Sequence, residues 1–172
     1  KALIAIENRD VKVQAWLYRV KSPTGGELPV LFLDTDIPGN LAEDRKITDH
    51  LYGGDKSYRL KQEIVLGIGG ARLLQILGFR VRKYHLNEGH AAFALLEKIR
   101  RSLQSGVSFQ AACQAVREKT VFTTHTPVPA GHDTFPYALI EKYFDTYWSD
   151  LGLAREALFK LGGFSQQHQE GF

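Results

Sequence analysis

Between residues 59 and 150 the sequence alternates between helical and strand-like hydrophobic patterns, and this alternation most restricts the possible folds. The expected elements are, in order, a helix over 59–78, a strand over 79–86, helices over 89–106 and 108–119, a strand from 120 and a helix from 136. Strands that alternate with helices predict βαβ units on a parallel sheet. The fold class is therefore α/β, with a partial Rossmann-like parallel sheet and flanking helices.

A β-hairpin is predicted ahead of this part, over residues 11–36. Residues 11–20 alternate apolar and polar side chains, and residues 21–27 (KSPTGGE) are typical of a turn. Residues 28–36 form a nearly continuous apolar run, so the second strand is expected to be more buried than the first. Residues 37–58 are irregular and polar, which indicates a long functional or mobile loop.

Composition excludes several functional classes. The chain of 172 residues is 44% hydrophobic, so it can bury a core, and its net charge of +3 does not indicate a nucleic-acid partner. No apolar run reaches the length of about 20 residues that a membrane helix needs. The single cysteine, Cys113, agrees with a reducing compartment, the cytoplasm. The chain contains no methionine, which suggests a processed product or a piece of a longer protein.

Two polar clusters follow the predicted strands of the α/β part. Ligands of open α/β sheets bind beyond the carboxyl ends of the strands, so both clusters are candidate walls of a site. The first contains His85, Asn87, Glu88 and His90, and the second contains Thr123, Thr124, His125, Thr126, His132 and Asp133.

Structural roles for these residues are equally open at this point. Asn87 or Glu88 could cap the following helix, with Gly89 permitting the tight entry, and His90 could be hydrogen-bonded in its first turn. A metal held by His85, Glu88 and His90, joined by His125 or His132, is disfavoured because the spacing does not place the ligands on one helix face. Gly67 to Leu74 (GIGGARLL) lacks a complete dinucleotide motif and predicts close helix packing.

Three segments in order resemble the glycogen and starch phosphorylase family, in particular the shorter α-glucan phosphorylases of bacteria and archaea. They are RLKQE (59–63), HLNEGHAA (85–92) and TTHTPVPAGHDTF (123–135), and LYGGD (51–55) strengthens the resemblance. Against the large enzymes of the family, His85, Glu88, Gly89 and Thr124 replace glutamine, aspartate, threonine and asparagine. The resemblance covers residues 11 to 140.

The resemblance implies a GT-B architecture, with this chain as a fragment of the N-terminal Rossmann-like domain. It implies phosphorolysis of a terminal α-1,4-linked glucose of glycogen, starch or maltodextrin, with retention, to glucose 1-phosphate. The cofactor would be pyridoxal phosphate, and its lysine, like most of the phosphate-binding residues, would belong to the C-terminal half of the enzyme. The fragment alone is therefore expected to be inactive. The domain would comprise the hairpin 11–36, a gate-like loop 37–58 and the α/β part 59–150.

The resemblance also assigns roles to residues. His125 matches a histidine that contacts the C6 hydroxyl of the bound glucosyl unit, and Glu88 and His90 match residues that order the sugar pocket. No catalytic residue and no metal ligand is assigned in this chain. The substrate-binding residues are expected to be His125, Asn87, Glu88, His90 and Asp55, the last on the gate, with support from Arg59, Thr124 and Thr126.

Two alternatives remain beside the phosphorylase hypothesis. The chain could be a non-catalytic α/β fragment, or a module that binds glucan without chemistry. A retaining glycosidase is disfavoured, because such an enzyme needs two carboxylates that flank the scissile bond and Glu88 has no evident second.

Overall fold

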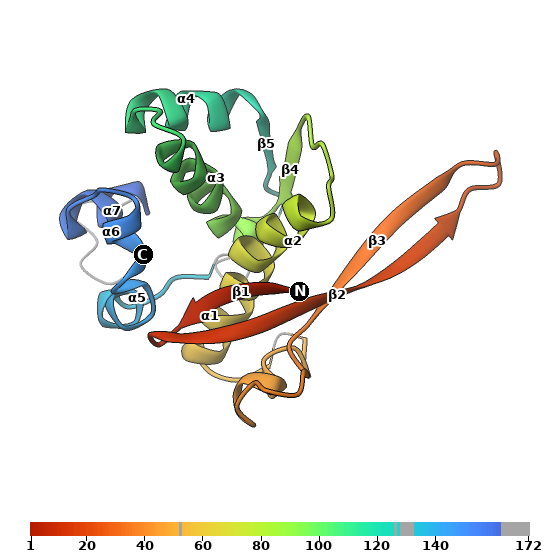
Figure 1. Cartoon of the computed structure of the whole chain (residues 1–172), viewed down its shortest axis with the longest axis horizontal. Helices are drawn as coiled ribbons and strands as arrows, with labels where there is room; N and C mark the ends of the chain where they lie inside the picture. Colours follow the sequence, from red (N-terminus) through yellow and green to blue (C-terminus); the bar gives the residue numbers. More distant parts are fainter. Residues whose placement is uncertain (52, 126, 128–132, 163–172) are drawn as a thin grey trace.

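The computed structural model describes residues 1–51, 53–125, 127 and 133–162. These residues form a mixed α/β structure with a three-stranded antiparallel sheet, a two-stranded parallel sheet and helices between and beside them (Figure 1). No helix among the described residues combines the length and the apolar character needed to cross a membrane.

The antiparallel sheet is a meander of β1 (Ala2–Ile6), β2 (Arg9–Lys21) and β3 (Glu27–Asp34). The predicted hairpin is confirmed, and its strands pair from Gln14 with Asp34 to Lys21 with Glu27. The first half of β2 pairs instead with β1, a strand that the sequence analysis missed. The expectation that the second strand is the more buried is wrong, because only β2 contains fully buried residues.

The predicted helix over 59–78 is three consecutive segments: α1 (Lys56–Ile64), a π-helical turn η2 (Val65–Gly69) and α2 (Gly70–Ile76). Gly78, with φ +78°, follows its end as expected. The expected close packing at Gly67 is confirmed, since a Cβ there would lie 2.8 Å from the backbone nitrogen of Ala94. The surrounding helix α3 (Phe93–Gln104) packs on η2, and both contribute to the main hydrophobic core.

The parallel pair is β4 (Tyr84–Asn87) and β5 (Thr120–Thr123). The crossover between them consists of the short turn η3 (Gly89–Ala91), α3 and α4 (Phe109–Glu118), as the alternating pattern predicts. Among the described residues the parallel sheet has only these two strands, which is a smaller sheet than a Rossmann-like domain contains.

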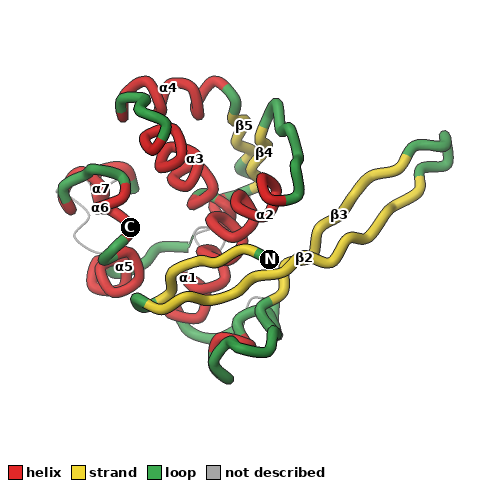
Figure 2. The backbone as a smooth tube through the Cα atoms, viewed as in Figure 1, coloured by secondary structure: helices red, strands yellow, loops and turns green. Residues whose placement is uncertain are grey.

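Three shorter helices complete the described chain on the side opposite the hairpin (Figures 1 and 2). The helix expected from Pro136 is divided into α5 (Tyr137–Phe144) and α6 (Tyr147–Asp150). The sequence analysis missed α7 (Arg155–Leu161). The loop 37–58 contains a 3-10 turn, η1 (Asp44–Lys46), and it leads into α1.

Candidate functional site

The parallel pairing of β4 and β5 brings the two predicted polar clusters together. Asn87, the last residue of β4, lies opposite Thr123, the last residue of β5. One residue further, the backbone N–H of Glu88 donates to the carbonyl oxygen of Thr123 at 2.9 Å. The two clusters therefore share one sheet edge, at the carboxyl ends of both strands, where the sequence predicts a ligand site.

Glu88 connects the two strand ends through its side chain. Its backbone has φ +61°, a left-handed conformation that is uncommon outside glycine, and Gly89 has no positive φ. The carboxylate does not cap η3 but turns toward the segment after β5, where it accepts the backbone N–H of His125 at 2.8 Å. The expected capping role of Glu88 is therefore wrong, because its oxygen binds a partner 37 residues away.

The imidazole of His125 is held at this edge from two sides. Its Nε2 lies 2.8 Å from Oδ1 of Asn87, and its Nδ1 lies 3.3 Å from Oε1 of Glu88. The amide oxygen only accepts, so Nε2 carries a proton in this arrangement. The side chain of His125 is nevertheless 61% exposed. We call His125, Asn87 and Glu88 the strand-end group; it presents a positioned ring to the outside of the sheet.

Two further residues of the predicted clusters pair with each other. Nε2 of His85 lies 2.6 Å from the hydroxyl oxygen of Thr123. Thr124 is exposed beside them, whereas Thr126 and His132 lie outside the described residues. Substrate contact by Thr124 and Thr126 remains a prediction.

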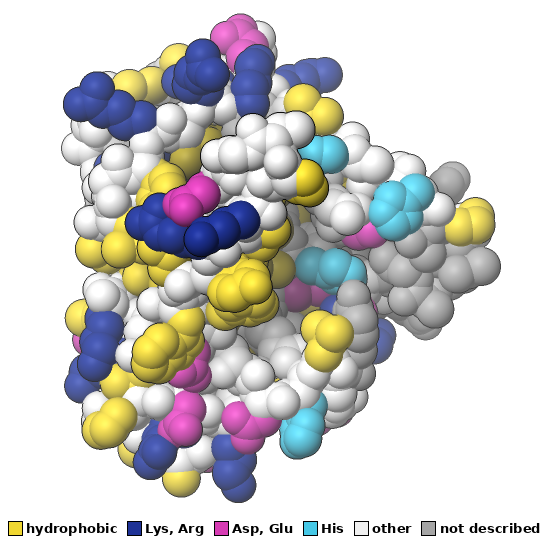
Figure 3. Space-filling view, turned by 90° about the vertical axis from the view of Figure 1, so that its right-hand side faces the viewer, with side chains coloured by type: hydrophobic (Ala, Val, Ile, Leu, Met, Phe, Trp, Pro, Cys, Tyr) yellow, Lys and Arg dark blue, Asp and Glu magenta, His cyan; other side chains and the backbone are white. Residues whose placement is uncertain are grey.

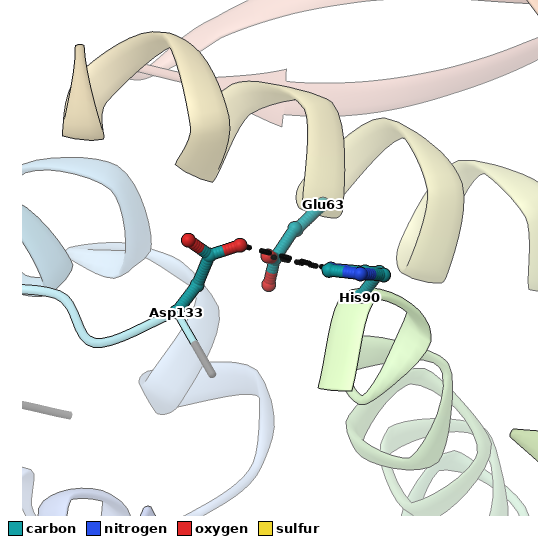
Figure 4. A group of neighbouring side chains, drawn as sticks. All are labelled: Glu63, His90 and Asp133. Atoms are coloured by element: carbon teal, nitrogen blue, oxygen red, sulfur yellow. Dashed lines mark ion pairs between the residues drawn. The ribbon is translucent and has the colours of Figure 1, made fainter. Parts of the chain in front are cut away.

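A second group of charged side chains lies where α1, η3 and the segment before α5 meet (Figure 4). We call Arg59, Glu63, His90 and Asp133 the Glu63 cluster. Nη2 of Arg59 donates to Oδ2 of Asp133 at 2.6 Å and lies 3.4 Å from Nδ1 of His90. The same His90 nitrogen lies 3.6 Å from both Oε1 of Glu63 and Oδ2 of Asp133. Arg59 and His90, predicted from separate motifs, thus belong to one cluster.

Glu63 is the buried member of this cluster, with 6% of its surface exposed. Its Oε1 has no hydrogen-bond partner among the described residues, and Nη2 of Arg59 lies 3.8 Å away. Burial and the neighbouring carboxylate of Asp133 raise the pKa of Glu63 to about 8. Burial acts in the same direction on Asp133, but its hydrogen bonds with Arg59 and Glu63 outweigh it and hold the pKa of Asp133 below its usual range. Glu63 therefore carries a proton at neutral pH and Asp133 does not.

Metal ligation was weighed for this cluster because Glu63, His90 and Asp133 offer three ligand atoms within 4.8 Å of one another. They are a different set from His85, Glu88 and His90, which the sequence analysis considered. The guanidinium of Arg59 already lies 2.6 Å from Asp133, so a permanent cation neutralises this carboxylate. A divalent ion would meet that positive charge at close range, and the absence of a metal requirement remains our prediction.

Asp55 occupies a different position from the other predicted residues. Its carboxylate caps α1 by accepting the backbone N–H of Tyr58 at 2.8 Å. The preceding loop is anchored at several points: Asp44 is buried and bound by Arg9, and the side chain of Gln62 donates to the carbonyls of Ile47 and His50. A gate role for this loop and substrate contact by Asp55 remain predictions.

Sequence reasoning missed the participation of Glu63 and Asp133. Glu63 was quoted only within the RLKQE motif, although its position four residues after Arg59 places both on one helix face. Asp133 was noted in the second polar cluster but was assigned no role. Its ion pair with Arg59 joins residues 74 positions apart, and no local pattern indicates such a contact.

Comparison with known proteins follows the pattern of the motifs. No family model matches the chain. Over 159 residues, 92% of the chain, it is 45% identical to the maltodextrin phosphorylase of Thermococcus litoralis. Over 151 residues it is 42% identical to the glycogen phosphorylase of Mycobacterium tuberculosis, and over 164 residues it is 34% identical to that of Aquifex aeolicus. The similarity extends well beyond the three motifs.

The chain is much shorter than these relatives. It spans 18% of the length of the Thermococcus protein, 17% of the Mycobacterium protein and 23% of the Aquifex protein. The similarity therefore concerns one segment of each relative.

Proposed function

Because this chain is homologous to one segment of the glycogen and maltodextrin phosphorylases, we propose that it is part of an α-1,4-glucan phosphorylase. Within that enzyme it supplies the wall of the active site that faces the sugar. The observation that carries this assignment is the strand-end group, in which Asn87 and Glu88 hold an exposed His125 at the carboxyl ends of two parallel strands. The GT-B architecture belongs to the same proposal, with β4 and β5 as strands of its N-terminal domain.

The chemistry of the strand-end group suits a neutral sugar. Glucose presents hydroxyl groups that donate and accept hydrogen bonds, and each one must be paired when it leaves water. An imidazole, an amide and a carboxylate provide donors and acceptors on one edge. In the proposed complex the C6 hydroxyl of the terminal glucosyl unit replaces Asn87 as the partner of His125, and the released amide group of Asn87 turns to the sugar.

The Glu63 cluster supports this wall without contact to the reacting atoms. Asp133 follows the segment after β5 that carries His125, and Arg59 binds Asp133 and faces His90 of η3. Arg59 thereby connects α1 to both sugar-facing segments. Thr124, Thr126 and Asp55 complete the proposed contacts of the site.

The proposed reaction transfers a glucosyl unit to inorganic phosphate. The bond between C1 and the glycosidic oxygen breaks, a bond from C1 to a phosphate oxygen forms with retention, and a proton is delivered to the departing oxygen. Pyridoxal phosphate, through its phosphate group, supplies the proton partner when it is bound. None of the residues of this chain is assigned to hold it. The role of the chain is to bind the sugar and to exclude water from it, in an enzyme that we place in the cytoplasm.

Phosphorolysis assays test this function. Incubated with maltodextrin, phosphate and pyridoxal phosphate, the 172-residue chain should release no glucose 1-phosphate, because it contains only a fifth or so of a phosphorylase polypeptide. A polypeptide of phosphorylase length that contains this chain should release it in proportion to bound cofactor. An inactive long polypeptide that binds cofactor and glucan would contradict the proposal and favour a glucan-binding module.

A further inference from the structure

The outer part of the hairpin is an arm without neighbours. From Gln14 to Asp34, β2 and β3 pair only with each other, and among the described residues no further strand joins either edge. Figure 1 shows this arm projecting away from the helices. A two-stranded ribbon by itself is at best marginally stable in water, so a projecting arm of this length needs a partner.

The register of the arm concentrates its large apolar side chains on one face. In an antiparallel pair, directly opposite residues share a face, and residues two apart along a strand do so as well. The register places three cross-strand pairs in a row: Trp16 with Phe32, Tyr18 with Val30, and Val20 with Leu28. Trp16, Tyr18 and Leu28 are 61%, 60% and 63% exposed. We call these six residues the apolar face.

The opposite face of the arm has a different character toward its tip. Arg19, Lys21 and Glu27 lie there, and Arg19 forms an exposed ion pair with Glu27 at 3.2 Å. The six residues of the apolar face include no charged side chain. Contiguous exposed apolar patches mark interaction sites, and permanent interfaces are the most apolar of them.

The apolar face continues into a hollow beside the candidate site. Phe32 belongs to the face and also lines a cavity of about 400 Å³, together with Leu51 and Leu66. Arg59 and His90 line the same cavity. Figure 3 shows hydrophobic side chains gathered around a hollow on this side of the molecule, with histidines beside it. A partner that covers the apolar face and the hollow therefore also closes the wall next to the Glu63 cluster.

We propose that the apolar face and the adjoining hollow are the docking surface for the remaining part of the phosphorylase polypeptide. This inference rests on the proposed function, because that polypeptide supplies the phosphate and cofactor groups. The relatives extend the chain about fivefold, which leaves ample polypeptide to cover the face. A second copy of the chain would cover the face as well, but it would bring no cofactor lysine to the hollow.

Hydroxyl-radical footprinting with mass spectrometry reads the exposure of Trp16, Tyr18 and Phe32 individually. The 172-residue chain is compared with a polypeptide of phosphorylase length that contains it. In the longer polypeptide, oxidation of the three side chains should fall about fivefold or more, because interface cores are desolvated. Equal oxidation in the two proteins overturns the proposal. Protection in the long polypeptide without phosphorolysis supports the docking surface and contradicts the proposed function, so the two failures are distinguishable.

Two further measurements separate the occupants. Sedimentation of the 172-residue chain over a range of concentrations should show no dimer whose formation protects Trp16, and such a dimer would overturn the assignment to the longer polypeptide. Protection of the isolated chain by added maltodextrin would also overturn it, in favour of a glucan. The expected result in both experiments is unchanged oxidation of the isolated chain.

A matched pair of variants tests the face directly. Tyr18→Lys and Arg19→Lys place the same side chain on neighbouring positions of β2, on opposite faces. In the isolated chain each should change the midpoint of thermal unfolding by no more than about 2 °C, because both positions are exposed. In the longer polypeptide Tyr18→Lys should lower the midpoint clearly and Arg19→Lys should not. Equal effects of the two variants there contradict docking on the apolar face.

Discussion

Glu97 and Glu63 each lie on the buried side of a helix beside an arginine, and the pKa values of their carboxyl groups are shifted in opposite directions. Glu97 is 0% exposed and Glu63 is 6% exposed. Burial alone raises the pKa of both groups, since it disfavours the charged form. The difference between them therefore comes from their hydrogen-bond donors.

Glu97 is surrounded by donors from three helices. Arg72 of α2 and Arg100 of α3 each donate to both carboxylate oxygens at 2.7–3.0 Å, and the hydroxyl of Tyr147 donates at 2.8 Å. Although burial is the largest single influence, these bonds together hold the pKa of Glu97 below its usual range. Arg72 also donates to the carbonyl of Leu3, so this carboxylate connects the helices to β1.

Glu63 has its arginine in a different arrangement. Arg59 directs its short contact to Asp133 at 2.6 Å, while its Nη2 remains 3.8 Å from Oε1 of Glu63. The proton that Glu63 retains is the consequence. The comparison teaches that the number of donors at hydrogen-bond distance, and not the presence of an arginine, decides whether a buried carboxyl group is charged. A fully bonded carboxylate stabilises the fold, whereas an incompletely bonded one beside a cavity can respond to pH or to a bound neighbour.

The largest expected effect is the loss of Glu97. Glu97→Ala leaves Arg72, Arg100 and Tyr147 without their shared acceptor, and it should lower the free energy of unfolding by about 3–5 kcal/mol. Urea denaturation of the 172-residue chain measures this. Glu118→Ala, at the exposed end of α4, is the control and should change stability by no more than about 0.5 kcal/mol. Similar losses in the two variants would show that Glu97 is not a structural centre.

The next effect concerns pH and has opposite signs for the two carboxyl groups. The pKa of Glu63 is about 8 in the folded state and near 4.5 in the unfolded state, so the folded chain binds more protons between these values. Its contribution to stability is therefore complete below pH 4.5 and is lost as the pH rises to 8, by up to roughly 1.4 kcal/mol per pH unit. Glu97 behaves conversely: its lowered pKa adds stability above pH 4.5 that is lost as the pH falls.

Glu63→Gln isolates the first of these slopes, because the amide has the same shape and does not titrate. Urea denaturation at pH 5, 6, 7 and 8 should show the chain losing stability relative to the variant as the pH rises. Glu156→Gln on the exposed side of α7 should leave the slope unchanged. A pH-independent difference between the chain and Glu63→Gln would mean that Glu63 is charged throughout this range.

Local patterns predicted much of this fold. The turn residues and the alternating run of β2 identify the hairpin, and the strand, helix, helix, strand order identifies β4, α3, α4 and β5. The strand β1 was missed because its turn is Glu7-Asn8, with φ of 50° and 61°, instead of a glycine-containing pair. The apolar run of β3 predicted burial correctly in kind, but the side chains that would cover it are not among the described residues.

The candidate site was predicted in part for the same reason. Positions at strand ends follow from element order, so the sequence placed Asn87, Glu88 and His125 on one edge. The Glu63 cluster depends on distances between side chains that lie far apart in sequence, such as Arg59 and Asp133. A pattern of polar residues indicates neither how many donors reach a buried carboxyl group nor which partner an arginine selects.

The contact between His125 and the C6 hydroxyl of the terminal glucosyl unit is the central claim of this account. A single hydrogen bond between uncharged partners contributes about 0.5–1.5 kcal/mol, and an unpaired buried hydroxyl costs more. In a polypeptide of phosphorylase length, His125→Ala should therefore lower kcat/KM roughly ten- to a few hundred-fold without abolishing activity.

The most direct measurement is kcat/KM of this polypeptide and its His125→Ala variant, each on maltodextrin and on a maltodextrin whose terminal residue lacks the C6 hydroxyl. The unchanged polypeptide should lose much of its rate on the deoxy substrate, whereas the variant should lose far less, because its contact is already absent. Equal losses in the two proteins would contradict the account, and they would leave His125 as a structural residue bound to Asn87 and Glu88 at the end of the sheet.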